Sequence, residues 1–152
     1  DITTAISGGV GYDPGGMNNT ALGWGNSGLH VYVAFGNSAI LARYTMSTAY
    51  DMVDVHNQVG LDFTQTTSSG ALNLDGNCLG IAFEADGKTM YILDDGGLKI
   101  RFYSLVTAWD FRTATATGEY ITVPANSRCL DYQNGIFYVA DGASSGWMYA
   151  FS

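Results

Sequence analysis

Residues 83–110 read FEADGKTMYILDDGGLKIRFYSLVTAWD and align without a gap on residues 24–51, WGNSGLHVYVAFGNSAILARYTMSTAYD, at an offset of 59 positions (83 − 24). Six positions are identical in the two segments, and most other apolar positions are matched in kind. A weaker third copy follows near the end of the sequence, so one supersecondary unit is used several times. The identical pairs are Gly28/Gly87, Tyr32/Tyr91, Tyr44/Tyr103, Thr48/Thr107, Ala49/Ala108 and Asp51/Asp110.

The second unit predicts four antiparallel strands that run from an apolar inner strand to a polar outer one. Cys78–Phe83 is almost wholly apolar, as expected when both faces of a strand are buried. A turn at Asp86-Gly87 then joins this strand to the next as a hairpin. Leu98–Leu105 alternates, which predicts a half-exposed strand whose apolar face carries Ile100 and whose other face carries Tyr103. The predicted strands are Cys78–Phe83, Thr89–Leu93, Leu98–Leu105 and Tyr120–Val123, the last preceded by the threonine-rich run 113–117.

The first and third units follow the same order of strands, but the third unit lacks its fourth strand. The segment Asp1–Ile6 resembles residues 110–115, which follow Trp109 and lead into the outer strand of unit two. We therefore expect the N-terminal segment Asp1–Ser7 to supply the missing outer strand. The predicted strands are Asn19–Trp24, Leu29–Ala34, Ala39–Met46 and Asp51–Val59 in unit one, and Arg128–Tyr132, Ile136–Ala140 and Trp147–Phe151 in unit three.

Several motifs of unit two resemble a known class of repeats. The turn at Asp86-Gly87, the run 90–95 (MYILDD), the strand 99–105 (KIRFYSL) and the segment 107–114 (TAWDFRTA) are similar to the β-propeller repeats of NHL and YVTN type. The similarity is greatest to the variety found in marine phage structural proteins and secreted bacterial repeat proteins, and it covers residues 19–152. The resemblance implies an all-β fold of four-stranded antiparallel propeller blades. Such repeats specify the blade and say little about activity.

We expect one propeller-type domain, residues 1–152, with three blades in the chain. Residues 1–18 are the N-terminal donor strand and linker, 19–60 form blade 1, 75–123 form blade 2 and 127–152 form the incomplete blade 3. Propellers close with about four to eight blades, so three blades leave unpaired strands at each end. Edges of this kind bind another copy or aggregate.

We therefore expect copies of the chain to assemble by strand exchange, which would pair the strands at the open ends. Two chains of three blades each would close a six-bladed ring, whereas a geometry that does not close would propagate a filament. A fragment of a longer propeller is a third interpretation, because Asp1 falls near a blade boundary. The expected interface residues are Ile2, Thr4 and Ile6 on the donor side and Trp147, Tyr149 and Phe151 on the acceptor side.

The composition limits the possible partners and compartments. The chain has 47% hydrophobic residues, 13% charged residues and a net charge of −8, and no two of its Lys and Arg residues are adjacent. Phosphate backbones and anionic membrane surfaces both attract clustered cations, so we expect no nucleic-acid partner and no membrane insertion. The sequence begins at Asp1 rather than Met, which suits a processed and exported chain and predicts an extracellular or virion-surface location.

No catalytic or metal-binding constellation stands out in the sequence. His30 and His56 have no nucleophile or further ligand near them, so we interpret both as surface or packing residues. The turn Asp94–Gly97 lacks the full ligand spacing of a calcium loop. Cys78 and Cys129 each precede a leucine and are expected to be equivalent, buried thiols rather than a disulfide. We expect no cofactor and no metal.

Three functions remain open at the level of the sequence. The first is a non-enzymatic structural or adhesive subunit of an extracellular or viral assembly, in the form of a fibre, filament or closed ring built by edge-strand exchange. The alternative is a propeller module that binds a surface glycan or a peptide through Trp147, Tyr12 or Tyr132. The third is a metal-dependent propeller hydrolase or lyase, which the apolar inner strands disfavour. We expect that the chain is not an enzyme.

Overall fold

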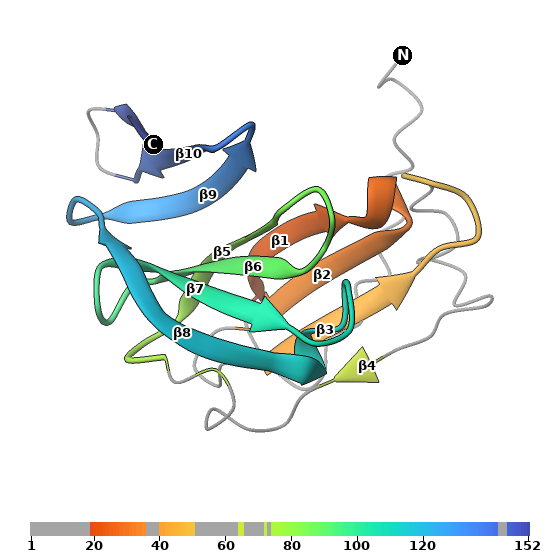
Figure 1. Ribbon diagram of the computed structural model, residues 1–152. Coiled ribbons are helices and arrows are strands. Elements are labelled where there is room, and N and C mark those ends of the chain that lie inside the picture. The colour runs from red at the N-terminus through yellow and green to blue at the C-terminus, as the bar shows by residue number, and fades with distance from the viewer. Residues whose placement is uncertain (1–18, 36–39, 51–63, 66–71, 73, 143–145) are drawn as a thin grey trace, which may run out of the picture.

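The computed structural model describes residues 19–35, 40–50, 64–65, 72, 74–142 and 146–152. These residues form an all-β structure of three antiparallel sheets (Figure 1). Within the described part of the chain, the short 3-10 helices η2 (Asn26–Gly28) and η3 (Phe111–Thr113) accompany the strands. Within this part of the chain no helix is long and apolar enough to cross a membrane.

The first sheet has the strand order β1-β2-β3-β4. Its first three strands begin and end within one residue of the predicted ranges. The strand that pairs with the outer side of β3 is β4, which the sequence did not indicate. Residues 51–59, where the outer strand was predicted, lie outside the described residues. The bounds are β1 (Asn19–Gly25), β2 (His30–Phe35), β3 (Ile40–Thr45) and β4 (Thr64–Gln65).

The second sheet has the order β5-β6-β7-β8, and the third has three described strands in the order β11-β10-β9. The predicted strands are confirmed here, with β8 uniting the two outer segments expected from the sequence. The bounds are β5 (Cys78–Phe83), β6 (Thr89–Asp94), β7 (Lys99–Leu105) and β8 (Ala114–Thr122), followed by β9 (Ser127–Gln133), β10 (Ile136–Asp141) and β11 (Met148–Phe151).

The inner strands β1, β5 and β9 each have a shift of register at the same place, where they pair with β2, β6 and β10. In β5 it lies between Cys78 and Gly80, and in β9 between Ser127 and Cys129. The structural equivalent of Cys78 is therefore Ser127, and Cys129 stands at the position of Gly80. The prediction that the two cysteines are equivalent is wrong, because it rested on two Cys-Leu dipeptides whereas strand pairing fixes the register.

The sheets pack face to face in the order of the chain (Figure 1). Strand β5 lies against β1 and β2, and β9 lies against β5 and β6. A first cluster of buried side chains fills the interface between the first and second sheets, and a second cluster fills the next interface. The middle sheet is thus covered on both faces. The first cluster includes Tyr32, Leu41, Ile81, Phe83 and Ile92, and the second includes Leu79, Tyr91, Leu93, Leu130, Phe137 and Val139.

Tyr103 is fully buried, which corrects the prediction of a half-exposed strand with this residue on its outward face. Its ring belongs to the first cluster, and its hydroxyl donates a hydrogen bond to the carbonyl oxygen of Leu72. The alternation in the sequence predicts one buried and one solvated face. Because the middle sheet has a neighbour on each side, both faces of β7 contribute to a core.

A glycine and an aromatic ring form the same corner in the first two sheets. The amide of Tyr50 donates to the carbonyl oxygen of Gly28 at 2.8 Å, and the amide of Trp109 donates to that of Gly87 at 2.9 Å. All four residues have positive φ, and each ring lies so close to its glycine that a Cβ there would overlap it. Tyr50 and Trp109 also align on each other in the repeat, which indicates the same packing role for both rings.

Candidate assembly interface

Equivalent aromatic side chains join neighbouring sheets. Tyr32 of β2 packs on Phe83 of β5 with ring centroids 4.4 Å apart, and Tyr91 of β6 packs on Tyr132 of β9 at 4.7 Å. The register of the inner hairpins makes these two contacts equivalent and places Tyr138 of β10 third in the tyrosine series. The first two tyrosines each face the following sheet. Tyr138 has the same orientation, but no described sheet follows it.

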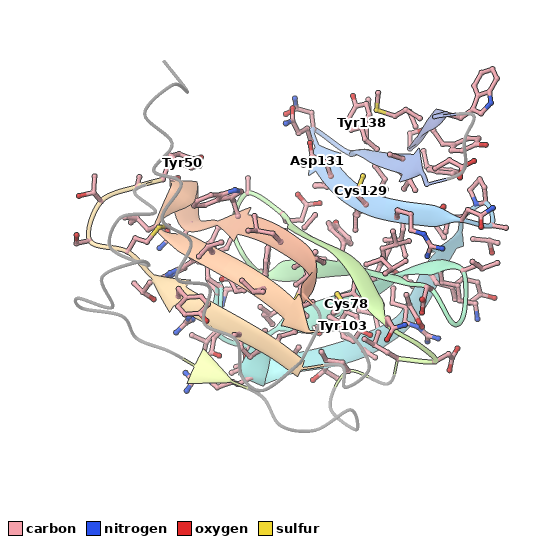
Figure 2. All side chains as sticks on the ribbon, turned by 180° about the vertical axis from the view of Figure 1, so that it is seen from behind. Tyr50, Cys78, Tyr103, Cys129, Asp131 and Tyr138 are labelled. Atoms are coloured by element: carbon pink, nitrogen blue, oxygen red, sulfur yellow. The ribbon has the colours of Figure 1, made fainter. Side chains whose placement is uncertain are left out.

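The face of the third sheet that is turned away from the middle sheet, which we call the outer face, forms an open hollow of about 350 Å³. Figure 2 shows Cys129, Asp131 and Tyr138 on this sheet. Tyr91, the equivalent of Tyr138, is buried because the third sheet covers it, whereas Tyr138 is only half-buried. The hollow is lined by Cys129, Leu130, Asp131, Gln133, Tyr138, Ala140 and Met148.

Strand β11 forms the outer edge of the third sheet within the described part of the chain. Trp147 lies just before this strand and is 64% exposed, and its main-chain carbonyl oxygen accepts a hydrogen bond from the amide of Asp141 at 2.8 Å. Tyr149 and Phe151 lie on the face of the third sheet that is turned toward the middle sheet, where Phe151 packs against the second cluster. The expected acceptor residues are therefore divided between an exposed edge and an inward face. The expected donor residues, Ile2, Thr4 and Ile6, lie outside the described residues.

The first sheet carries an exposed apolar side chain at the opposite end of the stack. Leu22 of β1 is 52% exposed, whereas its equivalents Ile81 and Leu130 are 2% and 8% exposed. The equivalents are buried because a preceding sheet packs on their strands. Val31 and Met46 lie on the same side of the first sheet as Leu22 but are buried in a third cluster. Sequence reasoning missed the exposure of Leu22, because the match to the buried Ile81 in the repeat gives no sign of which sheet lies at the end of the stack.

Glu84 strengthens the interface between the second and third sheets. Its carboxylate accepts hydrogen bonds from the hydroxyls of Tyr91, at 2.7 Å, and Tyr132. Burial, together with the hydrogen bond to the carboxylate, raises the pKa of Tyr91, so this hydroxyl stays a donor even in alkaline solution that would ionise an exposed tyrosine. In the preceding interface the hydroxyl of Tyr32 donates to the carbonyl oxygen of Trp109 at 2.7 Å. Tyr32 and Tyr91 are thus each fixed by the ring and by the hydroxyl.

Asp94 is fully buried at the end of β6 and anchors the turn that follows. Its carboxylate accepts hydrogen bonds from Nε of Arg101 at 2.7 Å and from the amides of Asp75 at 3.0 Å and Gly96 at 3.1 Å. Arg101 also forms an ion pair with Asp75. These contacts give the turn Asp94–Gly97 a structural role. Among the described residues, no group of three or more His, Cys, Asp or Glu is arranged to hold a metal ion.

His30 takes part in the packing of the first sheet. Its ring nitrogens lie 3.2 Å from Nδ2 of Asn26 and 3.2 Å from Oγ1 of Thr45. Its ring also meets Tyr32 edge to face, with centroids 6.3 Å apart. These contacts agree with the interpretation of His30 as a packing residue. His56 lies outside the described residues.

The two cysteines differ in accessibility, which corrects the expectation of two buried thiols. Both are free, but Cys78 is buried and Cys129 is exposed on the outer face (Figure 2). The thiol of Cys78 lies in the first cluster and donates a hydrogen bond to the carbonyl oxygen of Gly80. Burial raises the pKa of Cys78 to about 12.

Cys78 should be nearly inert to alkylation in the folded protein. At about pH 8, a thiol with a pKa of about 12 has a thiolate fraction of about 10⁻⁴, and burial also blocks the reagent. We expect the Cys129→Ser variant to react with iodoacetamide only after guanidinium unfolds it, as counted by intact mass spectrometry. Rapid labelling of this folded variant would contradict the burial of Cys78.

The fold is similar to that of β-propeller structures. A chain in a crystal structure of a nidogen/laminin complex matches 88% of this chain and 44% of its own length, with a TM-score of 0.57 and 16% sequence identity. Hydrazine synthase of Kuenenia stuttgartiensis matches 95% of this chain and 35% of its own length, with a TM-score of 0.51 and 10% identity. At these identities the likeness shows the fold alone, and the chain spans less than half the length of either structure.

No protein-family model matches the sequence, and no curated protein matches it. The similarity to NHL and YVTN repeats therefore rests on the motifs of the sequence. The structural matches support a β-propeller-like, all-β fold. Within the described residues its three sheets do not close into a ring.

Proposed function

We propose that the chain is a non-enzymatic structural or adhesive subunit of an extracellular or viral assembly, in which copies join through their open ends. Its three sheets act as three blades of a propeller, and the N-terminal segment Asp1–Ser7 of a partner completes the third blade. The observation that carries the proposal is the open edge of the third sheet. Its strand β11 has no outer neighbour among the described residues, whereas the corresponding strand β7 of the middle sheet pairs with β8.

The exposed groups at this end of the molecule support association. Unpaired strand edges offer main-chain donors and acceptors to another chain. Beside the edge, Trp147 and Met148 are 64% and 69% exposed, so an apolar surface accompanies the free backbone groups. Large apolar side chains next to an open edge are typical of interaction sites. A ring of two chains and a filament both use this one contact.

A binding module for a surface glycan or peptide is a second candidate, which the exposure of Trp147 favours. An indole that stands clear of the core offers a flat platform for a sugar ring or an apolar peptide side chain. This function requires no assembly, because the platform is present on one chain. Binding that is independent of the particle mass would favour it over the structural role.

Deleting Asp1–Ser7 tests the structural role. We expect the truncated chain to lose its assembly and to become poorly soluble, because the edge of β11 then has no strand to receive. Sedimentation velocity of the truncated and complete chains measures the change. Substituting Ile2 and Ile6 with serine should weaken assembly, whereas substituting Thr3 and Ala5 with serine should leave it intact, since alternate residues of a strand face opposite sides.

A truncated chain that remains soluble and assembles like the complete chain would contradict strand donation. Equal behaviour of the two substituted chains would contradict the assignment of Ile2 and Ile6 to the contact.

A further inference from the structure

We infer that the outer face of the third sheet is the docking site for the first sheet of a second copy of this chain, with Leu22 of one copy packed against Cys129 of the other. The inference rests on the proposed self-assembly and gives that assembly a register. It concerns the packing of sheet on sheet, which is separate from the donation of the N-terminal strand.

The order in which the sheets pack within one chain carries the inference. The inner strand β5 of the second sheet lies against β1 and β2, and the inner strand β9 of the third sheet lies against β5 and β6. Continuing this series by one step places the inner strand of a further sheet against β9 and β10. In a second copy that strand is β1, so the docking surface would be continuous with two interfaces already present in the chain.

A close contact between inner strands fixes the register. A Cβ placed on Gly80 would lie 2.5 Å from Cβ of Leu130, so these two positions touch across the interface between the second and third sheets. The next interface has Cys129 at the position of Gly80 and Leu22 of the second copy at the position of Leu130. In the first interface a Cβ on Gly23, the equivalent of Asp131, would lie 3.2 Å from Cβ of Ile81, so Leu22 of the second copy would lie beside both Cys129 and Asp131. A side chain at the position of Gly80 is compatible with packing, because Ala21 occupies it in the first interface and packs against the first cluster.

The aromatic side chains continue in the same register. Trp24 is equivalent to Phe83 and Tyr132, which receive the tyrosines of the preceding sheets. The tyrosine left without such a partner among the described sheets is Tyr138. In the assembled state Tyr138 of one copy would therefore pack on Trp24 of the next. The same contact would bury the exposed Leu22, so docking covers Leu22 at one end of the stack and Tyr138 at the other.

Asp131 places a charged carboxylate among the mainly apolar side chains that line the outer face. It stands at the position of Ala82 in the middle sheet, where the side chain is buried. Its carboxylate accepts hydrogen bonds from the amide of Tyr132 at 2.9 Å and from Nε2 of Gln133 at 3.4 Å. Bringing another sheet over this face removes water from the carboxylate, which opposes docking. Asp131→Ala should therefore tighten the association of copies.

Disulfide trapping tests the register with one substitution, because Cys129 is already present. The Leu22→Cys variant is oxidised with copper phenanthroline, and the disulfide is located by peptide mass spectrometry. We expect an intermolecular bond between the introduced thiol and Cys129, in about tenfold greater yield than for Val106→Cys, because contact raises the effective concentration of the two thiols. Val106 is a matched control, since it is also an exposed apolar residue, 79% exposed. Adding Cys129→Ser should abolish the bond.

The mass of the unaltered chain separates the two levels of the proposal. If that chain assembles but the introduced thiol bonds to its own counterpart or not at all, the register is wrong and self-assembly stands. If the chain stays monomeric and no bond forms, self-assembly fails as well, and something other than a second copy covers the outer face. The Asp131→Ala variant gives an independent result, because weaker association of this variant would overturn the docking of a sheet on this face.

Discussion

Replacing Asp94 with alanine is expected to lower the free energy of unfolding by about 3–5 kcal/mol, the cost of breaking a buried ion pair by removing one partner. Asp94 is fully buried and accepts hydrogen bonds from Arg101 and from two backbone amides. The substitution leaves these three donors without their acceptor, while Arg101 keeps its ion pair with the exposed carboxylate of Asp75. Urea titration followed by circular dichroism measures the loss.

Two variants control for the charge and for the truncation. Asp94→Asn keeps an acceptor oxygen but loses the ion pair, so its loss of stability should lie between those of the alanine variant and the unaltered protein. Glu119→Ala removes an exposed carboxylate and should change the stability by less than about 0.5 kcal/mol. A loss of under about 1 kcal/mol for Asp94→Ala would show that the network contributes little to the fold.

Gly87→Ala is expected to destabilise the protein by about 3 kcal/mol, of which about 1 kcal/mol is backbone strain and the rest is overpacking. Gly87 has a φ of 69°, in the left-handed region, and a Cβ at this position would overlap the indole of Trp109. Gly118 provides a matched control. Its φ is 86°, but nothing lies within 4 Å of the place where its Cβ would stand.

Gly118→Ala should therefore show the strain alone, about 1 kcal/mol. The difference between the two variants isolates the packing of Trp109 on the corner, and urea titration of both chains measures it. Equal losses in the two variants would mean that the indole moves aside at no cost, and the repeated glycine and aromatic corner would then be unimportant for stability.

The inner strands could be predicted closely from the sequence because two independent signals agree there. Cys78–Phe83 is apolar throughout and is bounded by turn residues, and the structure has β5 over this same range. The glycine and aromatic pairs repeat at a fixed offset, so their shared packing role could also be inferred. Local pattern and internal repetition therefore suffice where neighbouring residues decide the structure.

The failures concern properties that depend on distant parts of the chain. Tyr103 is buried because the middle sheet is covered on both faces, which the alternation within β7 cannot reveal. Cys129 is exposed because strand pairing, and not the Cys-Leu dipeptide, sets its position. The exposure of Leu22 likewise follows from its place at the end of the stack. Each of these outcomes depends on what packs against a residue, and the repeat alone gives only the residue's place within its own sheet.

The mass of the unaltered chain in solution, measured by light scattering across a range of concentrations, tests the central claim most directly. We expect particles of at least two chains, either a discrete dimer or filaments that lengthen with concentration. A particle of 16.2 kDa, the mass of one chain, at every concentration would contradict self-assembly through the open ends.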